Sequence, residues 1–291
     1  MSLSDIAPAK VNLSLAVTGR RADGYHTLES LVVFAGFGDR LTVEAHDSLD
    51  LQVDGPFAEG VPVDARNLVL KAAHLLQRET GTTQGARIRL TKTLPHGGGI
   101  GGGSSDAAVA LRLLARLWDV PAITPECAVA LGADVPVCMQ APQPQIMRGI
   151  GEVLSAAPVL PECWLVLVNP RVETPTGAMF QALGRKAPAP SDVALTVPLG
   201  MGHAAFALWL AAYGNDFADV LTDPASAVYL PEITQILQAL ADQDGCLMQN
   251  LSGSGSTCWG VFATQQAAEA AARRLAQKNA GWWVQPAQML S

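Results

Sequence analysis

Residues 94–108, Leu-Pro-His-Gly-Gly-Gly-Ile-Gly-Gly-Gly-Ser-Ser-Asp-Ala-Ala, say more about this chain than any other stretch. Six glycines, interrupted only by Ile100, strip the backbone of side chains, so a ligand can lie directly against it. Ala107–Trp118 follows, with the Ala and Leu content of a helix. A glycine loop leading into a helix start presents backbone N–H groups and the positive end of the helix dipole. The stretch therefore predicts an anion site, most often for a phosphate.

Three other interpretations of the glycine loop are weaker. A flexible Gly/Ser linker seldom lies between an alternating strand, here Ala86–Leu90, and an amphipathic helix. A Walker A loop needs a lysine directly after its glycines, and this sequence has none there. A run of glycines matches GxGxxG almost automatically, and the nearest acidic residue about twenty positions on, Asp119, lies at a helix end. We therefore set a dinucleotide-dependent dehydrogenase aside.

Composition and charge narrow the class of protein. The chain has 291 residues, enough for one large domain or two of ordinary size. Hydrophobic residues make up 49% and charged residues 15%, which is typical of a compact globular protein. The net charge is −7, from 19 basic and 26 acidic residues, and there is no basic tract. We therefore expect neither a nucleic acid nor a membrane as partner.

The cysteines and the N-terminus indicate the compartment. The five cysteines include no CxxC pair or other zinc-like spacing, so we expect buried, inert thiols. The N-terminus lacks the basic and apolar regions of a signal peptide, and no apolar run approaches the length of a membrane span. The expected location is the cytoplasm.

Hydrophobic periodicity predicts an α+β chain. Alternation predicts strands at Ala9–Val17, Leu28–Val33, Asp39–Ala45, Ala86–Leu90, Trp164–Val168, Cys246–Leu251 and Cys258–Phe262. Helical spacing predicts helices at Asn67–Glu79 with Asp64 or Asn67 as N-cap, Ala107–Trp118, Pro125–Leu131, Thr176–Leu183, His203–Tyr213, Pro231–Asp242 and Gln265–Lys278. Lys186–Asp192 is a Pro-rich connection. A boundary near Glu152–Pro161 predicts two domains, 1–155 and 156–291.

Three segments together resemble a known family. Pro95–Ala108 is similar to the phosphate-binding motif of the small-molecule kinases that include galactokinase, homoserine kinase, mevalonate kinase and phosphomevalonate kinase. Ala7–Leu13 resembles the first motif of that family and Asn250–Ser256 its third, in the family's order. The resemblance implies an N-terminal domain like domain 2 of ribosomal protein S5 and a ferredoxin-like C-terminal domain. It also implies ATP, with Mg²⁺, and a cleft between the domains where ATP and an alcohol substrate meet.

Three details resemble one branch of this family, whose substrate is a cytidine diphosphate derivative of methylerythritol. They are Lys10–Leu13, Arg21–His26 and Leu131–Pro136. The resemblance implies phosphorylation of the C2 hydroxyl of the methylerythritol unit. We expect the protein to be a monomer or homodimer. A homoserine or mevalonate kinase of the same family is the alternative activity. A non-catalytic small-molecule sensor on the same fold is the alternative outside enzymes.

Lys10 and Asp134 are the predicted catalytic pair. Phosphorylating an alcohol requires that its proton be removed as the γ-phosphoryl group arrives, and that positive charge offset the developing negative charge. A carboxylate beside a fixed ammonium can do both. By resemblance, Asp134 is the base, and Lys10 orients it and polarises the hydroxyl. From the residues alone, Lys10 could also be a strand-edge surface lysine and Asp134 a turn aspartate.

The resemblance assigns further residues to ATP and to the substrate. Those expected to bind ATP are Pro95, His96, Gly97, Gly98, Gly99, Ile100, Gly101, Gly102, Gly103, Ser104 and Ser105 in the loop, with Asn67, Leu68 and Lys92 on the adenine side. Those expected to bind the substrate are Asn12, Tyr25, His26, Thr176 and Phe180. Tyr25 would stack on the cytosine and His26 would hydrogen-bond to it. Phe180 could equally belong to the core, Lys92 could be an ordinary strand lysine, and Ser104 and Ser105 could cap the helix or bind Mg²⁺. Asp106 stands where the family often has Asn.

Overall fold

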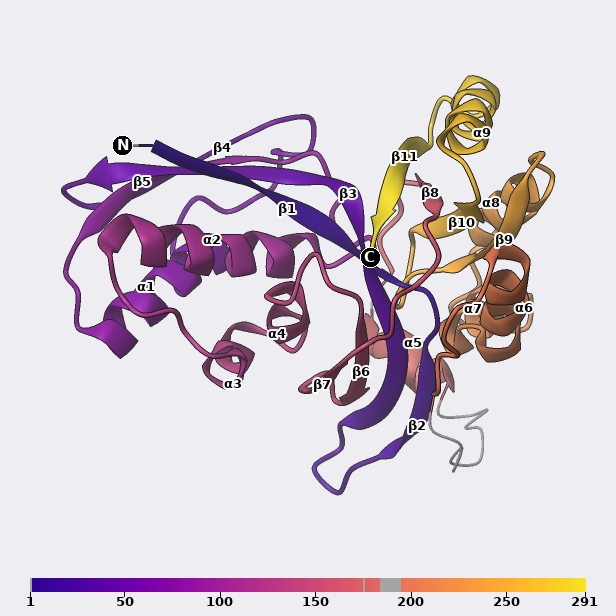
Figure 1. Cartoon of the computed structure of the whole chain (residues 1–291), viewed down its shortest axis with the longest axis horizontal. Coiled ribbons are helices and arrows are strands. Elements are labelled where there is room, and N and C mark those ends of the chain that lie inside the picture. Colours follow the sequence, from indigo (N-terminus) through magenta and orange to yellow (C-terminus); the bar gives the residue numbers. More distant parts are fainter. Residues whose placement is uncertain (1, 175, 184–194) are drawn as a thin grey trace. The chain divides into compact units, whose positions relative to one another are not determined.

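The computed structural model describes residues 2–174, 176–183 and 195–291. The expected connection Lys186–Asp192 lies outside the described residues. The chain forms two compact units, each built from several segments (Figure 1). Unit 1 comprises Met1–Lys10, Phe37–Pro95 and Gly101–Ala141, and unit 2 comprises Val11–Gly36, His96–Ile100 and Pro142–Ser291. The expected division at 155/156 stays a prediction.

The secondary structure of the described residues mixes strands and helices throughout. The strands are β1 (Ser2–Asn12), β2 (Ala16–Arg20), β3 (His26–His46), β4 (Leu49–Asp54), β5 (Gly85–Thr91), β6 (Gln145–Gly149), β7 (Val153–Ala156), β8 (Trp164–Asn169), β9 (Cys246–Leu251), β10 (Cys258–Phe262) and β11 (Trp283–Leu290). The helices are α1 (Leu68–Thr80), α2 (Gly102–Trp118), α3 (Pro125–Ala128), a 3-10 turn (Val129–Leu131), α4 (Val135–Cys138), α5 (Thr176–Leu183), α6 (His203–Tyr213), α7 (Asp216–Thr222), α8 (Pro231–Ala241) and α9 (Gln265–Lys278).

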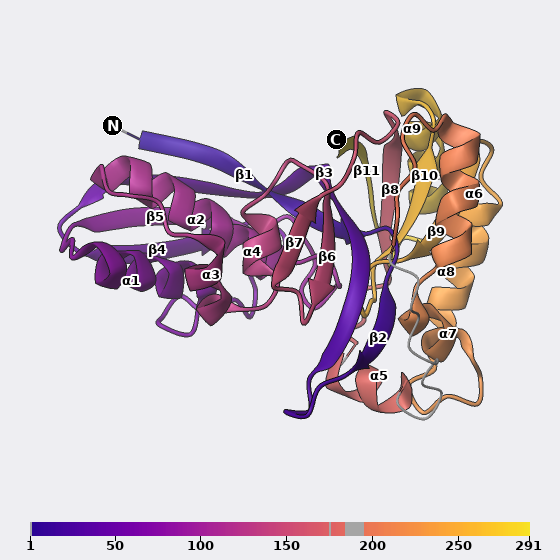
Figure 2. The same cartoon turned by 60° about the horizontal axis from the view of Figure 1, so that its bottom comes forward.

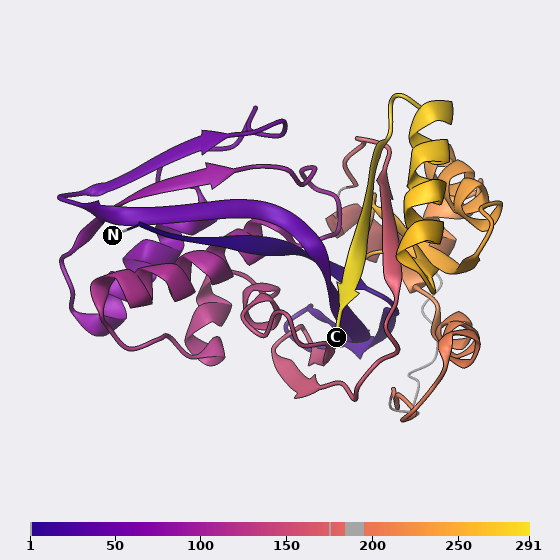
Figure 3. The ribbon, with the colours of Figure 1, turned by 45° about the horizontal axis from the view of Figure 1, so that its top comes forward.

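Unit 1 is a sheet with helices on one face. Strand β4 runs parallel to β5, β5 runs antiparallel to the second part of β3, and β1 also pairs with β3. Along β5, Ala86, Ile88 and Leu90 are buried while Arg87 and Arg89 between them are exposed. This alternation gives the sheet one apolar face, which α1 and α2 cover (Figure 3). The helices are apolar on the matching side, so the core of unit 1 lies between the two layers.

Strand β3 corrects the prediction of two strands at Leu28–Val33 and Asp39–Ala45. It runs without interruption through the glycines between them. A Cβ atom at Gly38 would lie 1.9 Å from the carbonyl oxygen of Ala7. The glycine therefore permits a close backbone approach inside the sheet and does not mark a turn. The prediction of one strand at Ala9–Val17 is also wrong. The structure has two strands there, because β1 ends at Asn12 and β2 begins at Ala16.

Helix α2 begins five residues earlier than predicted. Its first residue is Gly102, and Gly101 precedes it in the left-handed conformation, with φ of 62°. The prediction started at Ala107 because glycine and serine have low helix propensity. Residues 102–105 therefore form the first turn of the helix, which changes how the glycine loop presents its N–H groups.

Unit 2 contains a four-stranded antiparallel sheet in the order β11-β8-β10-β9. In chain order these strands are first β8, then β9, β10 and β11, with helices after β8 and between β10 and β11. A sheet with the order 4-1-3-2 and this connectivity is the split βαβ arrangement of ferredoxin-like domains. The predicted ferredoxin-like C-terminal domain is confirmed. Helices α8 and α9 lie on the same face of this sheet (Figures 1 and 2).

The core of unit 2 lies between that sheet and its helices. Val166 and Val168 of β8 pack with Ile233 and Ile236 of α8 and with Leu275 of α9, all buried. The rest of unit 2 includes β2 and β6, which both pair antiparallel with the first part of β3, and β7, which pairs with β6.

Most other predicted elements are confirmed. Strands β9 and β10 and helices α5, α6 and α9 have the predicted bounds, and α1, α8, β5 and β8 differ by one residue at one or both ends. The helix predicted at Pro125–Leu131 is instead the short helix α3 followed by the 3-10 turn. Asn67 is the N-cap of α1, and its side chain accepts a hydrogen bond from the N–H of Val69. The sequence did not predict β4, β6, β7, β11, α4 or α7. Among the described residues, no helix combines the length and the apolar character needed to cross a membrane.

Candidate active site

Lys10 and Asp134 form an ion pair in unit 1, although 124 positions separate them in the sequence. Lys10 Nζ donates to Asp134 Oδ2 at 2.8 Å. The Lys10 side chain is 4% exposed and that of Asp134 is 36% exposed. Lys10 is therefore not a surface lysine, and its ammonium is held against a carboxylate that solvent or a ligand can still reach.

The position of Asp134 argues against a purely local role for its carboxylate. Asp134 occupies the N-cap position of α4, but its side chain makes no capping hydrogen bond. An aspartate at this position usually accepts a bond from the first turn of the helix. Here the carboxylate turns to Lys10 on β1 instead, so the short helix serves to aim it. Cys138, at the end of α4, is fully buried, and burial raises the pKa of its thiol.

Gly101 lets the start of α2 approach Lys10. A Cβ atom at Gly101 would lie 3.1 Å from Cβ of Lys10, and its φ of 62° disfavours any other residue. The glycine therefore places the first turn of α2 beside the Lys10–Asp134 pair. Phosphate groups held at that turn would lie near the side chains that the reaction needs.

The first turn of α2 has the properties of an anion site. The first N–H groups of a helix have no partner within it, and the helix dipole makes this end positive. Gly103 is exposed at this turn. Ser105 is buried, and its Oγ has no hydrogen-bond partner among the described residues. A buried hydroxyl left without a partner is costly, so a ligand oxygen at this turn would satisfy it.

The remainder of the glycine loop, residues 96–100, rests on the third motif within unit 2. The N–H of Thr257 donates to the carbonyl of Gly98 at 3.0 Å, and Ser252 Oγ donates to the carbonyl of Gly99 at 2.9 Å. A Cβ atom at Gly99 would lie 2.3 Å from the carbonyl oxygen of Ser252, and one at Gly253 would lie 2.9 Å from that of Gly99. The two glycine turns thus interlock backbone against backbone, which side chains would prevent.

Ser252 also joins the first motif to this pair of turns. Its Oγ accepts from the N–H of Asn12 at 3.1 Å, while Trp259 Nε1 donates to the carbonyl of Asn12 at 3.0 Å. The side-chain amide of Asn12 donates to Ser30 Oγ at 2.7 Å. Asn12 Oδ1 is buried and has no partner in the part of the chain that the structure describes. The side-chain carbonyl oxygen of Asn12, a predicted substrate-binding residue, is therefore an acceptor without a donor among the described residues.

The residues expected on the adenine side lie in unit 1 around the start of α2. A Cβ atom at Gly103 would lie 3.5 Å from Cδ1 of Leu68, so the first residue of α1 packs beside the first turn of α2. The Asn67 side chain is already engaged, because it caps α1 and donates to the carbonyl of Pro62 at 2.7 Å. A role in adenine binding stays a prediction for both Asn67 and Leu68.

Lys92 is buried with two carboxylates. Its Nζ contacts Oδ2 of Asp39 and lies 2.7 Å from Oδ2 of Asp106. Burial opposes the charge of Lys92, but the two carboxylates outweigh it and raise the pKa of the ammonium. Burial raises the pKa of Asp106 to about 7, although Lys92 acts in the opposite direction. The prediction that Lys92 contacts adenine stays untested.

The residues expected to bind the base lie in unit 2. Tyr25 is 62% exposed in the turn before β3. His26 stacks on Phe180 with ring centroids 4.6 Å apart and an interplanar angle of 13°. Partial burial and then the charge of Arg20 lower the pKa of His26. Phe180 also meets Phe217 edge-on at 4.9 Å, so it serves the core as well.

The last predicted substrate residue, Thr176, is linked to the third motif. Its Oγ1 lies 2.9 Å from Oγ of Ser254. The stacked rings of His26 and Phe180 leave no space for a third ring between them. Tyr25 is the one aromatic of the expected set with a mostly exposed side chain. Cytosine binding by these residues stays a prediction.

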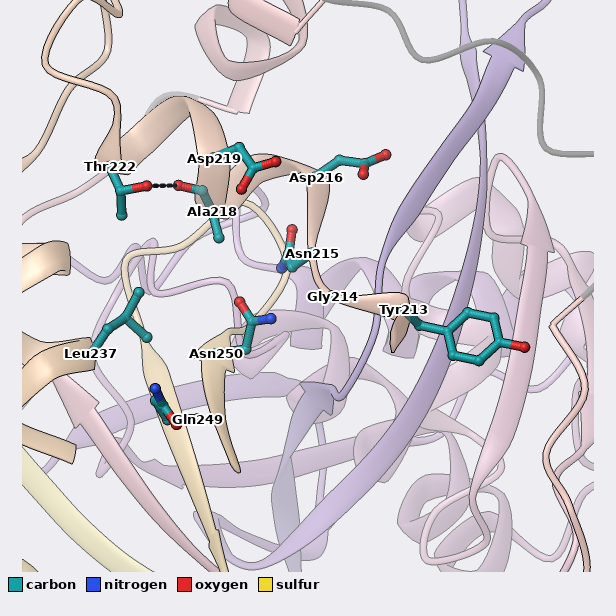
Figure 4. Close-up of a pocket in the computed structure, with 10 residues that line it drawn as sticks. All are labelled: Tyr213, Gly214, Asn215, Asp216, Ala218, Asp219, Thr222, Leu237, Gln249 and Asn250. Atoms are coloured by element: carbon teal, nitrogen blue, oxygen red, sulfur yellow. Dashed lines mark hydrogen bonds between the residues drawn. The ribbon is translucent and has the colours of Figure 1, made fainter. Parts of the chain in front are cut away.

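A separate pocket of about 280 Å³ lies in unit 2 (Figure 4). Asp216 and Asp219 of α7 and Gln249 and Asn250 of β9 are among its lining residues. It shares no residue with the predicted site. Asp216 has a structural partner there, because its Oδ2 accepts from the N–H of Val17 at 2.6 Å.

Three residues with supporting roles escaped the sequence analysis. Trp259 lay without an assigned role within the predicted strand Cys258–Phe262, and Ser252 was only part of the Asn250–Ser256 motif. Asp39 was placed at the start of a strand. The partners named above lie 53 to 247 positions away in the sequence, so no local pattern reveals them. A buried acid in a strand and a lone tryptophan before a glycine are the only signals.

The comparisons with known proteins agree with this geometry. The family model of the GHMP kinases N terminal domain matches residues 67–141, and that of the GHMP kinases C terminal domain matches residues 203–281. The chain belongs to the GHMP kinase family. The predicted two-domain α+β kinase fold and the predicted class of ATP-dependent small-molecule kinase are confirmed.

Full-length relatives point to one branch of the family. A protein of Jannaschia sp. (strain CCS1) named 4-diphosphocytidyl-2-C-methyl-D-erythritol kinase is 52% identical over 98% of this chain and 96% of its own length. One with the same name from Paramagnetospirillum magneticum is 50% identical over 100% of this chain and 99% of its own. A crystal structure of 4-(cytidine 5'-diphospho)-2C-methyl-D-erythritol kinase superposes with a TM-score of 0.78 at 32% identity. The superposition covers 99% of this chain and 100% of the chain in that crystal structure. The resemblance to this branch is confirmed, and the homoserine and mevalonate alternatives are not favoured.

Proposed function

We propose that the protein transfers the γ-phosphoryl group of ATP to the C2 hydroxyl of 4-diphosphocytidyl-2-C-methyl-D-erythritol. The products are ADP and the 2-phosphate, and the reaction is a step of the non-mevalonate route to isoprenoid precursors. The relatives that share this name over the full length of the chain support the substrate. The observation that carries the chemistry is the Lys10–Asp134 pair beside the first turn of α2.

The proposed reaction follows from the difference in solvent exposure between the buried Lys10 and the partly exposed Asp134. Asp134 Oδ2 is bound to Lys10, which leaves Oδ1 of a partly exposed carboxylate to accept the hydroxyl proton. The alcohol oxygen then attacks the γ-phosphorus, and the bond from that phosphorus to the bridging oxygen breaks, so that ADP leaves. The buried ammonium of Lys10 fixes the carboxylate and offsets negative charge that develops on the transferred group.

The donor set at the phosphate loop suits ATP with Mg²⁺ as a partner of the phosphates. Among the described residues, no group of three or more His, Cys, Asp or Glu side chains could hold a metal ion. Mg²⁺ in phosphoryl-transfer enzymes is typically held by few protein oxygens, by water and by the phosphates themselves. The unpartnered hydroxyl of Ser105 fits such a site. The neighbouring Ser104, which is only partly buried, is a second hydroxyl at this turn. The ion would neutralise charge on the phosphates.

Other expectations remain part of this proposal. We infer that Tyr25, His26, Thr176 and Phe180 bind the cytidine end of the substrate, and that the glycine loop binds ATP. The absence of a nucleic-acid partner is also proposed and rests on composition and charge. A cytoplasmic location and a monomeric or homodimeric assembly complete the proposal. Size-exclusion chromatography with light scattering would decide the assembly.

The deciding experiment compares alcohol substrates. Coupled ADP release is measured with ATP and Mg²⁺ against the cytidyl substrate, mevalonate and homoserine at equal concentrations. We expect turnover of the cytidyl substrate alone. Turnover of either of the others, with none of the cytidyl substrate, would contradict the proposed substrate while leaving the kinase assignment in place. Absence of ADP release with all three would favour the non-catalytic sensor.

A further inference from the structure

Three charged side chains are buried together beneath the first turn of α2. They are Asp39 on β3, Lys92 directly after β5, and Asp106 in α2, and their side chains are 0%, 6% and 5% exposed. Burying three charges is expensive, and apolar residues of similar size would often serve stability as well. The proposed chemistry uses none of the three. Their arrangement therefore calls for a reason other than stability alone.

Asp39 fixes the chain that enters the glycine loop. Its Oδ1 accepts from the N–H of Thr93 at 2.5 Å and from that of Leu94 at 2.9 Å. Thr93 Oγ1 donates to the carbonyl of Gly38 at 2.7 Å, so the same segment is tied to β3 a second time. Leu94 directly precedes Pro95, where the loop begins. One carboxylate thus sets the position of the backbone at the loop entry.

Asp106 fixes the chain that leaves the loop. It lies four residues after the first residue of α2, and its Oδ2 accepts from Lys92 Nζ at 2.7 Å. A Cβ atom at Gly102 would lie 3.5 Å from Lys92 Nζ and 3.6 Å from Asp39 Oδ2. The first turn of α2 therefore rests on the same ammonium that Asp39 contacts. Entry and exit of the loop converge on one cation.

We propose that Asp39, Lys92 and Asp106 form a clamp that positions the phosphate loop for ATP, an inference that rests on ATP binding at this loop. In this clamp, Lys92 and its two carboxylates act as positioning residues, which hold the loop through each other and need no contact with the nucleotide. The clamp also turns the charge of Asp106 toward Lys92, so the carboxylate is balanced where an unpaired one would repel phosphate.

The physical benefit is pre-organisation. A segment with six glycines has more conformations to lose on ordering than other chains of the same length. Fixing both of its ends before ATP arrives reduces the ordering that binding must bring about, and lowers the dissociation constant accordingly. The clamp holds the two ends, and its bonds engage the N–H groups of Thr93 and Leu94 and none of those of the glycines.

The test uses two substitutions of one residue. Asp106→Leu removes the acceptor at similar size and leaves the Lys92–Asp39 pair intact. Asp106→Asn keeps an oxygen that can accept from Lys92. Titration calorimetry with ATP and Mg²⁺ should show affinity about tenfold weaker in D106L and within about twofold of the original protein in D106N, since a bond to a charged group is lost in D106L alone. The KM of the alcohol should not change.

Asp39→Asn tests the clamp at the entry of the glycine loop. It also replaces D106L as the test variant if D106L does not fold. The amide oxygen that this substitution introduces can keep the bonds from Thr93 and Leu94, but its NH₂ group would then face the ammonium of Lys92. We expect the same loss of ATP affinity.

Thermal unfolding separates positioning from stability. A lower melting temperature with ATP affinity unchanged within twofold in the folded variants would overturn the clamp. Weaker ATP binding in a protein that phosphorylates none of the tested alcohols would support the clamp while contradicting the proposed function.

Discussion

Two lysine–carboxylate groups lie in the same unit, and they differ in what surrounds them. Lys10 meets one carboxylate, which is 36% exposed. Lys92 meets two carboxylates, and all three side chains are nearly inaccessible. The first group can present an oxygen to a reacting hydroxyl, and the second has none to present. The number of partners and the exposure of the acid therefore distinguish the proposed catalytic pair from the proposed clamp, although the residue types are the same.

The largest effect should come from Asp134→Asn. The variant loses the proposed base, and general base catalysis contributes about 10²- to 10⁴-fold, so kcat should fall by roughly 10³. ATP affinity should change little, because the loop and α2 are untouched. Steady-state kinetics and calorimetry measure the two quantities. Activity within tenfold of the original protein would mean that Asp134 is not the base.

Lys92→Met should disrupt the group of Lys92, Asp39 and Asp106, and its effect should be a loss of folding stability. The substitution leaves Asp39 and Asp106 buried and without a cation, and breaking a buried ion pair costs about 3–5 kcal/mol. Urea unfolding should show that loss. Lys10→Met is the matched control, since its carboxylate partner is partly exposed and should cost far less. Equal losses of stability in the two variants would erase the distinction between the groups.

Adjacent glycines provide a finer comparison of the same two groups. Gly101→Ala forces a left-handed φ on a residue with Cβ, which costs about 1–2 kcal/mol, and pushes against Lys10. Gly102→Ala meets the Lys92 cluster only at ordinary contact distances. We expect kcat about tenfold lower in G101A than in G102A, because displacing Lys10 moves the base. Similar rates in both would show that Lys10 tolerates the shift.

The smallest effect should come from a pair on the other face of the sheet. Arg87 and Glu44 form an exposed ion pair, with side chains 44% and 45% exposed. Exposed pairs contribute about 0–1 kcal/mol, so Arg87→Ala should change the unfolding free energy by less than about 1 kcal/mol and leave activity unchanged. A loss comparable to that of K92M would show that burial does not set the scale of these effects.

The outcome for α2 shows what sequence could and could not predict. The glycine loop was predicted to bind phosphate from its composition, because only bare backbone and a helix start are needed for that prediction, which stays untested. The start of α2 was misplaced, since propensity penalises the glycines that packing forces into the first turn. The two strands predicted within β3 failed for a related reason. A glycine that allows a close approach of β1 has the same sequence signature as one in a turn.

The supporting residues were beyond the reach of the sequence. Ser252 reaches Gly99 across 153 positions, and Lys92 reaches Asp39 across 53. Such contacts leave no periodic trace, because each depends on how distant strands are brought together. Lys10 and Asp134 were predicted, but through resemblance to a family and not through spacing.

The sequence by itself determined the elements with strong periodicity and the class of reaction, and it predicted the phosphate loop, because each of these follows from local composition or from motifs carried in order along the chain. Only the tertiary structure decided which lysine faces an accessible carboxylate and which is enclosed by two buried ones. Burial and the number of partners are properties of the folded neighbourhood, so no local pattern around either lysine could reveal them.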